Sequence, residues 1–90
     1  MASAILKDNW LSMTKEEALE WIAELFEEPV ENITPDTPRD DIPAWDSLGI
    51  LTLMARLDED FEILLEEEEV QELRSVNDIL EALKRHGKLN

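Results

Sequence analysis

The stretch DIPAWDSLGI, residues 41–50, divides the sequence into two parts of different character. All four prolines of the protein lie in residues 29–43, and proline interrupts regular helices. Beyond the stretch, apolar residues recur at helical spacing. Asp46 is a favourable N-cap residue, because its side chain can accept hydrogen bonds from the first N–H groups of a helix. The stretch therefore predicts a long loop followed by a helix that begins at Ser47.

This helix is predicted to extend over about residues 47–61. Its apolar side chains fall on one stripe, formed by Ile50, Met54, Leu57 and Phe61, with Leu51 and Leu53 beside it. In the preceding loop, Val30, Ile33 and Ile42 are the expected core anchors.

An earlier helix is indicated by Thr14 and Glu17, which form a capping-box pattern. Apolar residues then recur at i, i+3, i+4 and i+7 (Ala18, Trp21, Ile22 and Leu25), with Leu19 and Phe26 beside them. Pro29 should stop this helix. The three tryptophans, Trp10, Trp21 and Trp45, are interpreted as packing residues, and Trp45 as a wall at the base of a bound group.

Two helices are predicted after residue 65. A short one carries the acidic run Glu66 to Glu69 at its start, with Val70 and Leu73 facing inward. The last opens with a second capping-box pattern, Ser75 and Asp78, and ends before Gly87. No strand pattern is present. The sequence therefore predicts an all-α fold, a small four-helix bundle with a short third helix, formed by residues 14–87 between an extension (1–13) and a tail (88–90).

The charge balance limits the classes of partner. Asp and Glu number 23 against 8 Lys and Arg, which gives a formal net charge of −15. Such a surface repels phosphate backbones and anionic lipids, so nucleic acid and membranes are not expected partners. Proteins with basic patches are expected instead. There is no cysteine, no leader pattern and no stretch of membrane-spanning length, so we expect a cytoplasmic monomer.

Catalysis and metal binding are both unfavoured. A serine nucleophile needs a general base, and the only histidine, His86, lies at the end of the last predicted helix. The residues around Ser47 do not match the pattern G-x-S-x-G. The acidic residues Asp36, Asp40 and Asp41 lack the glycine and the glutamate of a calcium loop. We expect no catalytic residues and no metal site.

Ser47 is instead expected to be a point of attachment. At the first turn of a helix its hydroxyl should be exposed, and the free N–H groups and dipole of that turn favour an anion. A phosphodiester on this oxygen would be well placed.

The triplet Asp46-Ser47-Leu48 resembles the D-S-L motif of acyl carrier proteins, and the resemblance extends over about residues 14–86. It implies that Ser47 carries 4′-phosphopantetheine, transferred from coenzyme A by a phosphopantetheinyl transferase, and that the arm holds acyl groups as thioesters. Asp46 and Leu48 complete the motif. The positions implied for the core and acyl pocket are Ile50, Leu51, Met54, Leu57, Phe61, Leu65, Val70, Leu73, Val76 and Ile79.

A second face of the same helix is the predicted docking surface. Leu48, Thr52, Ala55 and Glu59 share this face, and Arg56 and Asp58 lie near it. The implied partners are the transferase and acyl-loading, condensing or acyl-transfer enzymes with basic patches. Gly49 is either space for the arm or the transferase, or a glycine tolerated at a helix start.

The leading hypothesis is a stand-alone acyl carrier of fatty-acid, polyketide or specialised-metabolite biosynthesis. Arg56 and Glu62 differ from the pattern of fatty-acid carriers and fit a specialised carrier. One alternative is an aminoacyl or peptidyl carrier. A second, from another class, is an acidic interaction module that is never modified.

Overall fold

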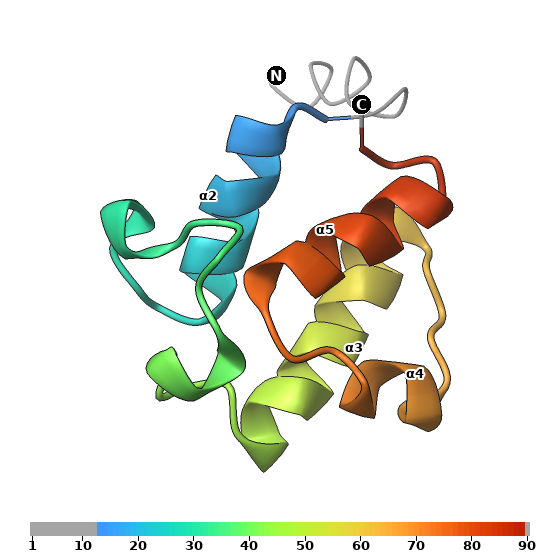
Figure 1. The fold of residues 1–90 in the computed structure, drawn as a ribbon. Helices are drawn as coiled ribbons and strands as arrows, with labels where there is room; N and C mark the ends of the chain where they lie inside the picture. The colour runs from blue at the N-terminus through green and yellow to red at the C-terminus, as the bar shows by residue number, and fades with distance from the viewer. Residues whose placement is uncertain (1–12, 90) are drawn as a thin grey trace.

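A computed structural model of the protein describes residues 13–89. These residues form four α-helices: α2 (Lys15–Leu25), α3 (Ser47–Phe61), α4 (Glu67–Gln71) and α5 (Val76–Arg85). Two short 3₁₀-helices, η1 (Val30–Asn32) and η2 (Arg39–Asp41), interrupt the long loop between α2 and α3 (Figure 1). No strand forms within residues 13–89, and the predicted all-α bundle with a short third helix is confirmed.

The helix starts follow from local capping chemistry. The Thr14 hydroxyl accepts a hydrogen bond from the Glu17 N–H, and the Glu17 carboxylate accepts one from the Thr14 N–H, so the first capping box is confirmed. The second is only half right. Ser75 caps α5 by accepting from the Asp78 N–H, but the Asp78 carboxylate accepts from the Arg74 N–H instead of from Ser75.

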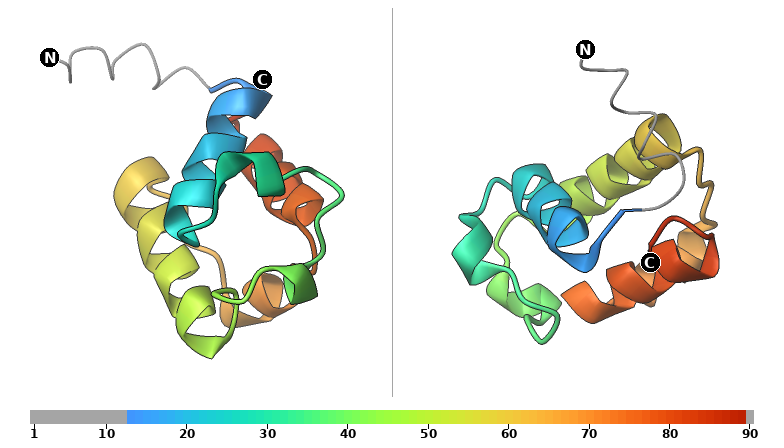
Figure 2. Two further views of the ribbon diagram at one scale, coloured as in Figure 1. Left: turned by 90° about the vertical axis from the view of Figure 1, so that its left-hand side faces the viewer. Right: turned by 90° about the horizontal axis from the view of Figure 1, so that it is seen from above.

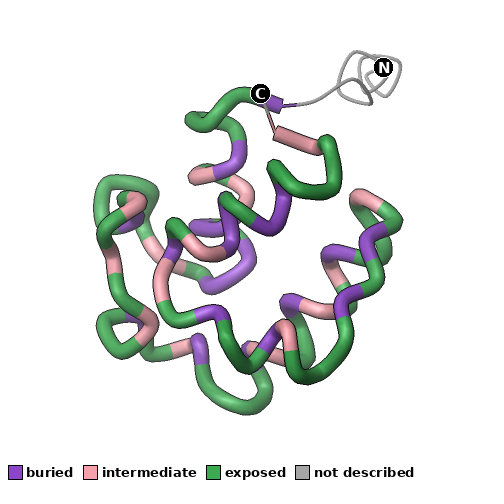
Figure 3. Tube along the Cα trace, turned by 45° about the vertical axis from the view of Figure 1, so that its right-hand side comes forward, coloured by how far each residue is buried: buried purple, intermediate pink, exposed green. Residues whose placement is uncertain are grey.

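The core lies between the inner faces of α2, α3 and α5, with α4 closing one end (Figures 1 and 3). Of the positions predicted for the core, six are buried: Leu57, Leu65, Val70, Leu73, Val76 and Ile79. Ile50, Met54 and Phe61 are half-buried and pack against them. The prediction for Leu51 is wrong, because its side chain is 61% exposed. At about 100° per residue, Leu51 is turned away from the stripe that Ile50 and Leu57 define.

The long loop is fixed by backbone hydrogen bonds to the start of α5. Arg39 N–H donates to the Arg74 carbonyl, Val76 N–H to Thr37, and Asn77 N–H to Pro35, at 2.7–3.0 Å. Ile33 and Ile42 are buried as predicted. Val30 is 44% exposed and is not a core anchor, since it begins η1, in which no residue is buried.

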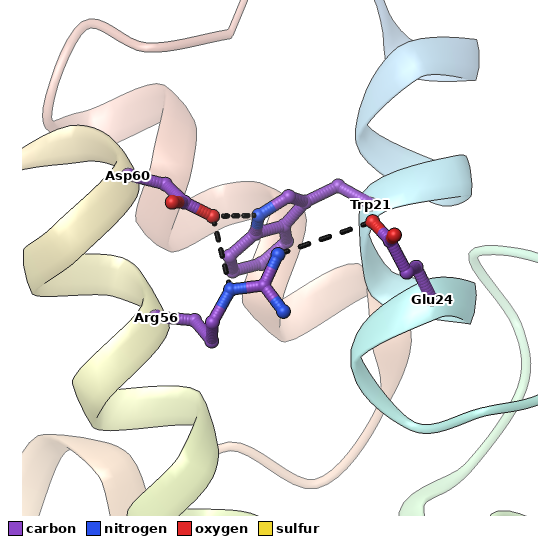
Figure 4. Close-up of polar contacts among 4 residues, drawn as sticks. All are labelled: Trp21, Glu24, Arg56 and Asp60. Carbon is purple, nitrogen blue, oxygen red and sulfur yellow. Dashed lines mark hydrogen bonds and ion pairs between the residues drawn. The ribbon is translucent and has the colours of Figure 1, made fainter.

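A polar cluster joins α2 to the last turn of α3 (Figure 4). The Trp21 Nε1–H and the Arg56 Nε–H both donate to Asp60 Oδ2, at 2.7 and 3.1 Å. The Arg56 guanidinium lies 5.9 Å from the centre of the Trp21 ring and 3.9 Å from a Glu24 oxygen. Trp21 also meets Phe61 edge to face. Trp21 is therefore a packing residue at the rim of the core, while the role predicted for Trp10 lies outside the described residues.

Candidate functional site: the first turn of α3

Ser47 is the first residue of α3 and is exposed. The start of α3 lies at the end of the molecule where the long loop enters the bundle (Figures 1 and 2). Asp46 before it has extended backbone, so the chain changes direction at this residue and presents Ser47 at the start of the helix. A hydroxyl in this position is accessible to another protein.

Asp46 shapes the electrostatics of this turn. Its Oδ1 accepts hydrogen bonds from the N–H groups of Leu48, at 3.1 Å, and Gly49, at 3.0 Å. The expectation that these N–H groups are free to receive an anion is therefore wrong, since the cap has already taken them. A phosphate on Ser47 would lie beside the Asp46 carboxylate and needs its positive charge from elsewhere.

Gly49 is buried, and the loop occupies the space beside it. A Cβ at this position would overlap the carbonyl oxygen of Ala44 and lie 2.9 Å from the carbonyl carbon. The glycine therefore permits close approach between the loop and the helix that it leads into. The sequence analysis interpreted Gly49 either as space for the arm or the transferase, or as a glycine tolerated at a helix start. The contact with Ala44 is a third reason for a glycine at this position.

Trp45 anchors the residues that lead into the site. Its side chain is only 3% exposed and stacks on Phe26, with ring centres 5.1 Å apart and 17° between the planes. Its carbonyl oxygen accepts a hydrogen bond from the Arg39 Nε–H at 3.3 Å. The predicted packing role is confirmed. Because both ends of Trp45 are held, the position of Ser47 two residues later is well determined.

The outer face of α3 carries the predicted docking residues. Leu48 is 73% exposed, and Thr52, Ala55, Asp58 and Glu59 are exposed as well. Leu51 belongs to this face, between Leu48 and Ala55, which the sequence analysis missed although i, i+3, i+7 spacing relates the three. Arg56 is half-buried and contacts α2 through the Trp21 cluster, so its guanidinium is engaged inside the molecule.

A pocket of about 470 Å³ lies beside the segment that leads into Ser47. It is lined by Pro38, Arg39, Asp40, Trp45, Gln71 and Arg74. The sequence analysis did not predict this pocket. Its lining residues come from two segments about thirty residues apart, and hydrogen bonds between the long loop and residues 74–77 hold these segments together.

Two features are absent from residues 13–89. No helix in this part of the chain is long and apolar enough to cross a bilayer. In the same residues, no three acidic or histidine side chains gather in a way that could hold a metal ion.

Comparison with known protein families matches residues 16–83 to the family described as a phosphopantetheine attachment site. The match includes all of α2 except Lys15, the long loop, α3, α4 and most of α5, and so contains the whole site described above. A comparison with curated proteins gave no match.

Proposed function

Because the chain belongs to the phosphopantetheine attachment-site family, a family of carriers with a covalently bound 4′-phosphopantetheine, we propose that Ser47 is its attachment residue and that the protein is an acyl carrier. The observation that carries the proposal is the exposed hydroxyl at the first position of α3, within Asp46-Ser47-Leu48. The thiol at the end of the arm holds cargo as a thioester. The cargo belongs to fatty-acid, polyketide or specialised-metabolite biosynthesis.

The attachment step is performed by a separate phosphopantetheinyl transferase. The Ser47 oxygen attacks the phosphorus of coenzyme A that bears the pantetheine, and a new O–P bond forms. The bond from that phosphorus to adenosine 3′,5′-bisphosphate breaks, and the serine proton passes to a base of the transferase. The transferase supplies that base because His86, the single histidine of the chain, stands beyond the last residue of α5.

The partners dock on the outer face of α3. Leu48, Leu51 and Ala55 give it an apolar centre, and Asp58 and Glu59 give it negative charge. A basic partner is attracted by the net charge of −15 and makes contacts that can be broken after each delivery. Thr52 lies on the same face, where its hydroxyl donates to the Leu48 carbonyl. Arg56 contributes indirectly, by fixing α3 against α2.

The test is the mass of the protein after incubation with coenzyme A and a broad-specificity transferase. The wild type should gain the mass of one phosphopantetheine, and Ser47→Ala should gain none. Ser75→Ala is a matched control, since Ser75 also stands at the start of a helix, and it should gain the arm like the wild type.

No gain in the wild type, or a gain that survives Ser47→Ala, would contradict the proposal. Circular dichroism of each variant checks that the helices are retained. A wild-type protein that gains no mass would favour the alternative interpretation, an acidic interaction module that is never modified. Loading of the armed protein with acyl or with aminoacyl groups by their respective enzymes separates the two carrier types.

A further inference from the structure

The pocket beside Trp45 brings cationic side chains to the same end of the molecule as Ser47. Arg39 comes from η2, Arg74 from the turn between α4 and α5, and Gln71 from the last position of α4. In Figures 1 and 2 these segments lie at the end of the bundle where α3 begins. Trp45, two residues before Ser47, forms part of the same wall.

The two arginines are attached to a fixed frame. The Arg39 N–H donates to the Arg74 carbonyl at 2.7 Å, so the backbones of the two residues are directly joined. The Arg39 side chain is also fixed, because its Nε–H donates to the Trp45 carbonyl and its guanidinium lies 6.0 Å from the centre of the Trp45 ring. This leaves the outer guanidinium nitrogens of Arg39 oriented before any ligand arrives, which lowers the entropic cost of binding.

The charges around these arginines are unusual for so acidic a protein. Within residues 13–89, the guanidinium groups of Arg39 and Arg74 form no ion pair within 4.0 Å, whereas that of Arg56 pairs with both Glu24 and Asp60. The Asp78 carboxylate contacts Arg74 only through the backbone N–H. Asp40 is the one acidic residue of the pocket lining, so the lining carries an excess of one positive charge. A cationic pocket of this kind, surrounded by a surface of opposite sign, attracts anions locally.

One residue of the pocket lining, Trp45, also has a buried donor without a partner. No acceptor is found for the Trp45 Nε1–H, although this atom is shielded from solvent. A buried polar group left without a hydrogen bond costs about 1–3 kcal/mol, and such groups are rare in folded proteins. Trp45, a residue of the pocket lining, therefore keeps one donor for which the described residues offer no acceptor.

We propose that this pocket binds an oxyanion carried on the arm, an inference that rests on the attachment of the arm to Ser47. The anion has two possible sources with the same chemistry: the phosphodiester at the root of the arm, or a carboxylate at the far end of its cargo. Asp46 already occupies the N–H groups of Leu48 and Gly49, so these two groups are not free to bind either anion. Arg39 and Arg74 supply that charge, with Gln71 as a neutral polar neighbour.

The test compares four forms of the isotope-labelled protein by NMR: without the arm, with the free arm, with a pentanoyl arm and with a glutaryl arm. Pentanoyl and glutaryl have the same chain length and differ in the terminal carboxylate. The resonances to follow are the Trp45 Nε1–H and the Arg39 and Arg74 Nε–H groups. Intact mass confirms the loading of each form beforehand, and a failure to load contradicts the proposed function instead of this inference.

Binding of the phosphodiester predicts that these resonances shift when the arm is added. Binding of the cargo predicts that they shift between the pentanoyl and glutaryl forms. In either case Arg74→Gln should remove the shift, while Arg85→Gln, an equal loss of charge at the exposed end of α5, should preserve it. Arg39→Gln is the second variant and should act like Arg74→Gln.

The inference is overturned if the loaded forms give the same resonances as the unloaded protein. It is also overturned if the shifts persist in both Arg74→Gln and Arg39→Gln. Arg74 is exposed, so its substitution by glutamine leaves the fold intact, and circular dichroism checks this point.

Discussion

The inner and outer faces of α3 carry the same residue type with opposite burial. Leu53 and Leu57 are 0% and 1% exposed, whereas Leu48 and Leu51 are 73% and 61% exposed. All four belong to one helix of fifteen residues. Whether a leucine of α3 is buried therefore depends on the side of the helix on which it lies, because the other helices cover only one side.

The two faces also differ in what they contribute to the molecule. Burial of a leucine side chain stabilises the fold by roughly 1.5–3 kcal/mol relative to leaving it exposed. Leu48 and Leu51 gain little of this free energy in the isolated protein. The proposed function gives them a role in contact with partner proteins, since exposed apolar residues rimmed by charge are a feature of interaction sites.

Truncation on the inner face should give the largest effect. Leu57→Ala removes a buried side chain from the middle of the core, and we expect the free energy of unfolding to fall by about 2–5 kcal/mol. Urea denaturation followed by circular dichroism measures the change. In a protein of 90 residues this loss is a large part of the total stability.

The matched control is Leu51→Ala on the outer face, which should change the free energy of unfolding by no more than about 0.5 kcal/mol. Equal losses at the two positions would show that Leu51 is packed in solution, and the distinction between the faces would then be wrong.

An intermediate effect is expected at Gly49, where the loop meets the first turn of α3. Gly49→Ala places a Cβ against the Ala44 carbonyl, so the loop or the helix must shift. We expect a loss of about 1–3 kcal/mol, although alanine is normally the better helix former. The same denaturation measurement applies, with Ser47→Ala as the neighbouring control that should change stability little.

The rate at which Gly49→Ala accepts the arm distinguishes the possible roles of this glycine. A variant that keeps its stability but is modified slowly would show that Gly49 makes room for the arm or the transferase. A destabilised variant indicates the close approach of Ala44.

Most of the helical architecture could be predicted because it depends on local signals. Thr14 with Glu17, Asp46 and Ser75 mark three helix starts, and the structure places caps at all three. Each signal lies within four residues of the group that it satisfies. Apolar spacing likewise identified Leu57, Val70 and Ile79 as buried, since each lies on the apolar stripe of its own helix.

The errors concern features that depend on distant contacts. Val30 is an apolar residue of the loop, and only the folded arrangement shows that nothing covers it. Leu51 is different, because its helical spacing from Leu48 and Ala55 already placed it on the outer face. The pocket with Arg39 and Arg74 exists because the loop pairs with the start of α5, and no local pattern predicts such a pairing. The triplet Asp46-Ser47-Leu48 was enough to propose Ser47 as the attachment residue. It did not predict that the Leu48 and Gly49 N–H groups beside Ser47 are already hydrogen-bonded to Asp46.

The smallest change in stability is expected on the outer face, where the same Leu51→Ala variant should affect docking. Loss of an apolar contact at the centre of the interface should raise the KM of the transferase for the carrier with little change in kcat, because the chemistry at Ser47 is untouched. About 1 kcal/mol of lost contact corresponds to roughly a five-fold fall in kcat/KM.

Leu64→Ala is the matched control, because Leu64 is 76% exposed but lies outside α3. If the two variants reduce kcat/KM equally, any exposed leucine affects the reaction, and the proposal that the outer face of α3 is the docking surface is wrong. If Leu51→Ala alone reduces it, the face that does least for the fold is the face that partner enzymes bind.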